Sequence, residues 1–130
     1  MDKKNKAVVP SDMKSLIASL PGKDYKKDLV HIFEFKRKYE QERYRKGKDF
    51  ISSLLEACYV VDRLHGTSID ADLRSSASGV VYGFLRKLRE DEIQQFHEAS
   101  KFDSGDNFLI KQFRLEKGLS PVGILCKMLV

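Results

Sequence analysis

Seven basic side chains lie within thirteen residues of this 130-residue chain, and their type and spacing predict a binding role. The basic segment, residues 36–48, reads KRKYEQERYRKGK and has only two acidic residues, so its net charge is +5. The whole chain also has a net charge of +5, so the remainder is neutral on balance. A neutral body with one basic stretch indicates an acidic partner, and nucleic acid is the leading candidate.

Two tyrosines interrupt the cations of the basic segment. Lysine and arginine bind phosphates, and exposed tyrosine can stack on an unpaired base, so this mixture slightly favours RNA or single-stranded DNA. The predicted binding residues, for nucleic acid or another acidic partner, are Lys36, Arg37, Lys38, Tyr39, Arg43, Tyr44, Arg45, Lys46 and Lys48. A second basic cluster, Arg86, Lys87 and Arg89, is a candidate extension of the same patch.

Two other interpretations of the basic segment stay open. It is an ordinary solvated helix surface if Glu40 and Glu42 form ion pairs with basic residues three or four positions away. Alternatively, the protein is a helical interaction module, such as an adaptor or a delivered effector. In that case the basic helix and an apolar groove bind an acidic protein partner, or the basic helix lies on an acidic membrane surface.

Helices are expected on both sides of the basic segment. On one continuous helix over residues 24–65, one face is apolar before and after the segment but not within it. The apolar residues are Leu29, Ile32, Phe33, Phe50, Ile51, Leu54, Cys58 and Val61, and the positions between are Lys36, Glu40, Arg43 and Gly47. We therefore expect an exposed helical arm anchored to the core at both ends. It is either one long helix or two helices with a break or kink near Gly47, and the glycine favours the break.

The full pattern predicts an all-α fold, a compact bundle of six or seven helices with a long or kinked central helix whose basic mid-section is exposed. Further helices are expected after the N-caps Ser11, Asp70, Asn107 and Ser120, and from Glu90. Alternating apolar residues leave a strand at residues 30–35 as an alternative. Residues 1–10 are expected to be a flexible tail, followed by one domain over residues 11–130.

Other chemistry finds no support in the sequence. There is no Gly-x-Ser-x-Gly or Walker-type motif, so we do not expect an enzyme. The three histidines, His31, His65 and His97, are widely spaced and the two cysteines are far apart, so no metal or other cofactor is expected. Cys58 and Cys126 are expected to be reduced and buried.

Location and assembly can also be predicted. No apolar run approaches the roughly 18 residues of a membrane span, and no signal peptide is apparent. We expect a cytoplasmic protein, or one in the host cytoplasm or nucleus if it is viral or delivered. The apolar helix expected at residues 120–130 either caps the core or forms a homodimer. Together these features predict a small non-enzymatic regulatory protein that binds nucleic acid through residues 36–48.

Overall fold

The computed structural model describes residues 9–46, 48–103 and 105–119. Within these ranges the chain forms six α-helices and two short 3-10 helices and has no β-strand, so the predicted all-α bundle is confirmed. The α-helices are α2 (Val9–Ser19), α3 (Lys26–Tyr39), α4 (Lys48–Arg63), α5 (Ala71–Arg86), α6 (Glu90–Ala99) and α7 (Phe108–Glu116). The 3-10 helices are η1 (Glu42–Arg45) and η2 (Leu64–Gly66).

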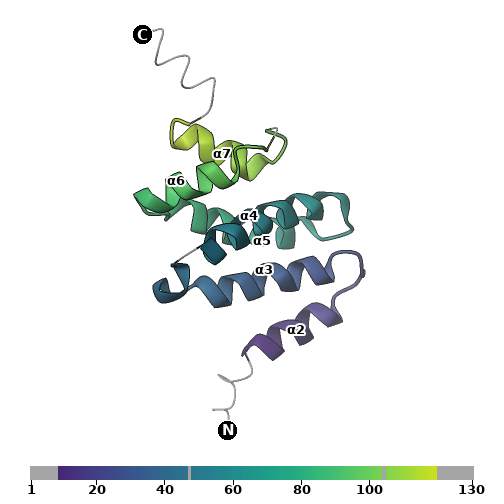
Figure 1. Ribbon diagram of the computed structural model, residues 1–130. Helices are drawn as coiled ribbons and strands as arrows, with labels where there is room; N and C mark the ends of the chain where they lie inside the picture. The colour runs from purple at the N-terminus through teal and green to yellow at the C-terminus, as the bar shows by residue number, and fades with distance from the viewer. Residues whose placement is uncertain (1–8, 47, 104, 120–130) are drawn as a thin grey trace.

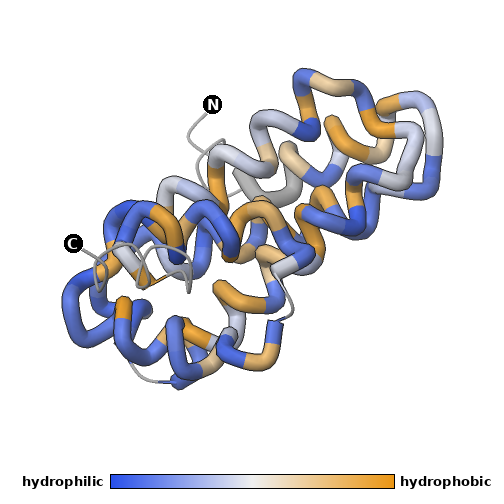
Figure 2. The backbone as a smooth tube through the Cα atoms, turned by 90° about the horizontal axis from the view of Figure 1, so that it is seen from above, coloured by the Kyte–Doolittle hydropathy of each residue, from blue (hydrophilic) through white to orange (hydrophobic). Residues whose placement is uncertain are grey.

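The helices are stacked in layers, with α4 at the centre (Figure 1). Helix α2 packs on α3, and α3 contacts both α4 and α5, while α4 also contacts α5, α6 and α7. A helix surrounded in this way must be apolar on several faces. The buried side chains of α4 are accordingly Phe50, Ile51, Leu54, Ala57, Cys58, Val60 and Val61. Hydrophobic and hydrophilic residues are interspersed along the helical backbone, as Figure 2 shows.

The predicted N-caps of α5 and α7 are confirmed. A side-chain oxygen of Asp70 accepts hydrogen bonds from the backbone N–H groups of Asp72 and Leu73, at 2.9 and 3.4 Å. The side-chain oxygen of Asn107 does the same for two N–H groups of α7. These oxygens accept hydrogen bonds from backbone N–H groups of the first helical turn, which have no carbonyl partner within the helix.

The structure corrects two sequence predictions about the helices. Helix α2 begins at Val9, earlier than expected, and the strand alternative is wrong because residues 30–35 lie within α3. Of the tail expected over residues 1–10, residues 9 and 10 belong to α2 and residues 1–8 lie outside the described residues. Gly47 and the helix expected over residues 120–130, which includes Cys126, also lie outside them.

The basic segment is not a single helical arm. Helix α3 ends at Tyr39 and α4 begins at Lys48, with η1 between them. The two helices pack against each other and run antiparallel in Figure 1. The break into two helices is therefore confirmed and the continuous central helix is wrong. The break lies well before Gly47, because the backbone becomes extended at Gln41, two residues after the end of α3.

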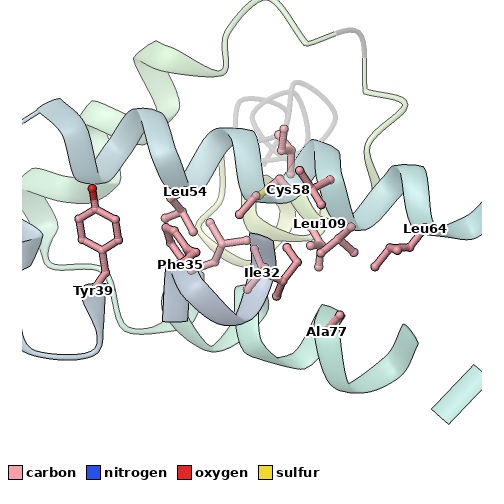
Figure 3. Packing of buried hydrophobic residues seen from close by; sticks show 14 of the residues in the cluster. Ile32, Phe35, Tyr39, Leu54, Cys58, Leu64, Ala77 and Leu109 are labelled. Atoms are coloured by element: carbon pink, nitrogen blue, oxygen red, sulfur yellow. The ribbon is translucent and has the colours of Figure 1, made fainter. Parts of the chain in front are cut away.

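Four aromatic rings join the two ends of this hairpin to α5. The ring centroid of Phe35 lies 5.2 Å from that of Tyr39 and 4.9 Å from that of Phe84, and the Tyr39 and Phe50 centroids are 5.2 Å apart. Figure 3 shows Phe35 and Tyr39 among the buried side chains beneath α4. Each such pair adds about 0.5–1.5 kcal/mol beyond simple burial. This aromatic cluster (Phe35, Tyr39, Phe50, Phe84) therefore anchors both ends of the basic segment.

Asn107 gives a direct test of how α7 is attached to the central helix. Its side chain is buried, its Nδ2 donates to the backbone carbonyl oxygen of Cys58 at 2.9 Å, and its oxygen caps α7. Asn107→Ala removes both interactions and is expected to lower the free energy of unfolding by about 2 kcal/mol in urea denaturation. The exposed cap variant Asp70→Ala is the control, with an expected loss of about 1 kcal/mol. An Asn107→Ala protein as stable as the control variant would contradict this dual role.

Candidate nucleic-acid interface

The basic segment is distributed over three consecutive elements. The last turn of α3 carries the first three cations, η1 carries the two arginines, and the start of α4 carries the last lysine. The exposed cations are Lys36, Arg37, Lys38, Arg43, Lys46 and Lys48. Because α3 and α4 are both packed on the core, these side chains extend from an anchored backbone.

The two acidic residues of the segment neutralise little of its charge. Glu40 Oε1 lies 3.4 Å from Lys36 Nζ, which confirms one of the expected short-range pairs. Glu42 instead pairs outside the segment, with its Oε2 2.8 Å from Arg89 Nη1. The other exposed cations of the segment form no ion pair with any residue that the structure describes. They are Arg37, Lys38, Arg43, Lys46 and Lys48. The charge excess seen in the sequence is therefore also an excess at the surface.

Tyr39 does not belong to the exposed surface, which corrects its predicted binding role. Its side chain is 3% exposed and its hydroxyl lies 3.4 Å from Ser53 Oγ on α4. The prediction wound residues 24–65 as one helix and placed the core face along Phe33 and Lys36. In α3 the buried face instead follows Leu29, Ile32, Phe35 and Tyr39. A ring held in this core cannot stack on a base.

Arg45 is also different from the exposed cations. Its guanidinium lies over the rings of Phe50 and Phe84, at 5.2 and 5.6 Å from the centroids, and the residue is partly buried. Its Nε and Nη2 are buried and have no hydrogen-bond acceptor among the described residues, so the aromatic faces are their main contact. A cation over an aromatic ring is attracted by the electron-rich face. Arg45 therefore packs η1 onto the aromatic cluster and is not one of the freely accessible cations.

Tyr44 is the tyrosine of the segment that remains accessible. Its side chain is 46% exposed. The guanidinium of Arg43 lies 4.9 Å from the centroid of its ring, and Arg43 Nη2 donates to its hydroxyl oxygen at 3.4 Å. Arg43 and Tyr44 thus form a cationic and aromatic pair at the surface of η1, where a base or a phosphate can approach.

Of the second basic cluster, Arg89 is the residue in contact with the basic segment, through its hydrogen bond to Glu42. Arg86 and Lys87 are exposed. The guanidinium of Arg86 lies 5.8 Å from the ring centroid of Tyr82, whose hydroxyl donates to Glu116 of α7. The predicted extension of the patch through Arg86 and Lys87 stays a prediction.

Arg89, by contrast, is occupied by carboxylates. Besides Glu42, it lies 3.2 Å from Glu92 Oε2 and 3.5 Å from Asp91 Oδ1. The hydrogen bond to Glu42, with the nearby charges of Glu92 and Asp91, raises the pKa of Arg89 above its ordinary value. The sequence did not reveal the Glu42–Arg89 pair, because its partners are 47 residues apart and no local spacing connects them. Arg89 therefore ties η1 to the start of α6 and contributes little free positive charge.

Comparison with known protein families, curated proteins and solved structures finds no match to this chain. Among the described residues, no three His, Cys, Asp or Glu side chains are grouped so as to hold a metal ion. No helix in the described ranges is long and apolar enough to cross a membrane. The candidate site must accordingly be judged on its own geometry and charge.

The contrast between the two arginines of η1 can be measured. Arg45→Ala is expected to lower the free energy of unfolding by about 1 kcal/mol, because it removes the cation from two aromatic rings. Arg43→Ala, the matched control on the same short helix, should change it by less than about 0.5 kcal/mol. Chemical denaturation of both variants checks this, and equal stabilities would show that Arg45 has no packing role.

Proposed function

We propose that this protein is a small non-enzymatic regulatory protein that binds nucleic acid, preferably RNA or single-stranded DNA, through the basic segment. The observation that carries the proposal is the set of exposed cations without ion-pair partners in the described part of the chain, namely Arg37, Lys38, Arg43, Lys46 and Lys48. Binding of a phosphate by such a side chain releases the counterions of the nucleic acid, which drives association.

The way the cations are anchored supports this function. The aromatic cluster, Arg45 and the Glu42–Arg89 pair hold η1 against α4 and α5. Cations on a backbone that is already ordered lose less conformational entropy on binding than cations on an unstructured tail. Glu42 is engaged by Arg89 and Glu40 by Lys36, so neither glutamate pairs with the free cations of the segment.

The preference for single strands rests on Tyr44. Bases in a duplex are stacked on each other, whereas unpaired bases can stack on an exposed aromatic side chain. With Tyr39 buried, Tyr44 is the segment's accessible platform, and Arg43 lies against it. The proposed contacts are therefore several phosphates and one base.

Charge reversal tests the phosphate contacts. The triple variant Arg43→Glu, Lys46→Glu, Lys48→Glu changes exposed residues and is expected to bind a short labelled RNA at least roughly tenfold more weakly. The slope of log K against log salt concentration is expected to become less steep by about 2, because about three phosphate contacts are lost. The control is the triple variant Lys23→Glu, Lys27→Glu, Lys111→Glu, which makes the same change in net charge elsewhere. Fluorescence anisotropy over a salt series measures both. Equal weakening in the two variants, or no binding by the wild type at low salt, would reject the proposed interface.

Substitution of Tyr44 tests base stacking separately from charge. Tyr44→Ala is expected to weaken binding of single-stranded RNA roughly tenfold, within the range of 1–3 kcal/mol for one stacked base. Tyr44→Phe keeps the ring and should bind like the wild type, and neither variant should alter binding to duplex DNA. The same anisotropy assay applies, and an equal loss for single-stranded and duplex ligands would show that Tyr44 does not select unpaired bases.

A further inference from the structure

A furrow runs between α2 and α3 on the outer side of the bundle. One hollow has an apolar floor formed by Met13, Val30 and Phe33, and an adjacent hollow extends along the same two helices past Ile17 and Lys27. The two hollows share Lys14, Val30 and Glu34, so they are consecutive parts of one feature, the α2–α3 furrow. The side chains of its floor are only partly buried, although they pack against the hydrophobic core.

The dimensions of the furrow fit a helix better than a small molecule. It follows residues 27–40, which corresponds to a length of about 20 Å, or nearly four helical turns. Its more enclosed hollow has a volume of about 130 Å³ and the adjacent, more open hollow about 490 Å³. The elongated shape of the furrow therefore favours a helix, because small molecules usually bind in one enclosed pocket of about 300–1,000 Å³. This space accommodates apolar side chains of a partner, as in the docking of an amphipathic helix into a groove.

The furrow carries an excess of positive charge among its described residues. Its two acidic residues are already paired, Glu34 with Lys14 at 2.9 Å and Glu40 with Lys36 at 3.4 Å. Lys27 and Arg37 also line it, and neither forms an ion pair with a residue of the described ranges. An occupant that supplies carboxylates at these two positions is therefore favoured over a neutral or basic one.

The two neighbouring acidic residues that the structure describes, Asp24 and Asp28, have other partners. Asp28 is bound by Arg63 Nη2 at 2.7 Å, and Asp24 accepts hydrogen bonds from the hydroxyl and the backbone N–H of Ser68. These hydrogen bonds from Ser68 lower the pKa of Asp24, so it is ionised and engaged at neutral pH. Within the described part of the chain, the positive charge at Lys27 and Arg37 is thus not compensated.

We infer that the α2–α3 furrow binds an acidic amphipathic helix of a partner protein. Apolar side chains of that helix, spaced at i, i+3 or i+4, and i+7, contact Met13, Val30 and Phe33, and its carboxylates pair with Lys27 and Arg37. Nucleic acid is a poorer occupant, because phosphates gain nothing from the apolar floor. The furrow shares Arg37 with the proposed nucleic-acid interface but does not include Arg43, Lys46 or Lys48, so variants of these three residues distinguish the two surfaces.

Designed peptides test the inference on the full chain. The probe is an amphipathic helical peptide with leucine at the anchor positions and glutamate on its flanks. One matched peptide has lysine in place of glutamate, and another has serine in place of leucine. In NMR titrations of labelled wild-type protein, the first peptide is expected to shift the amide signals of residues 27–37, and the matched peptides are expected to bind roughly tenfold more weakly. Binding of the lysine peptide as tightly as the glutamate peptide, or shifts confined to other elements, would overturn it.

Variants separate this surface from the nucleic-acid interface. Phe33→Asp is expected to weaken binding of the glutamate peptide roughly tenfold, and the control Leu115→Asp, an exposed apolar residue on α7, should bind it like the wild type. Phe33→Asp should still bind RNA, and the triple variant of Arg43, Lys46 and Lys48 should still bind the peptide. Loss of both ligands in either variant would overturn the assignment of two surfaces. If Phe33→Asp does not fold, Phe33→Ala replaces it in the same comparison. The peptide titration of the wild-type protein requires neither variant.

Discussion

The packing of four aromatic rings beneath one arginine is the constraint on which the surface of this protein depends. Phe35 and Tyr39 at the end of α3 meet Phe50 at the start of α4 and Phe84 near the end of α5, and the guanidinium of Arg45 covers the last two. Because these residues lie on both sides of η1 and within it, their burial fixes the path of the chain between two helices. The exposed cations are consequently displayed from an ordered turn.

Ion pairing at the same corner has a complementary effect. Glu42 is drawn toward Arg89, away from the cations next to it in sequence, and Arg89 also binds the buried carboxylate of Glu92. One acidic residue of the segment is thereby used to attach η1 to α6. The structure gains a long-range connection, and the neighbouring arginine and lysines keep their full charge. The ion pairs of Arg89 thus stabilise this corner and also leave the neighbouring basic surface uncompensated.

Helix α3 separates the two proposed binding surfaces. Its last turn contributes cations to the nucleic-acid interface, and its outer face forms one wall of the α2–α3 furrow with Val30 and Phe33. Arg37 belongs to both surfaces, since it is part of the basic segment and lines the furrow. One surface has the charge and aromatic content suited to phosphates and a base, and the other has the apolar floor suited to a helix. With both proposed surfaces, we propose that the protein joins a nucleic acid to an acidic protein.

Local patterns in the sequence were enough to predict the helices with strong signals, among them the caps Asp70 and Asn107, and to locate the basic segment. Those features depend on contacts within one or two turns, which residue type and spacing encode directly. The burial of Tyr39 and the packing of Arg45 on two rings could not be predicted, because α4 and α5 select the face of α3 that is buried and supply the rings beneath Arg45. Nor did the sequence by itself determine the Glu42–Arg89 pair or the α2–α3 furrow. These depend on which elements meet in space, and only the tertiary packing of α3, α4 and α5 decides that.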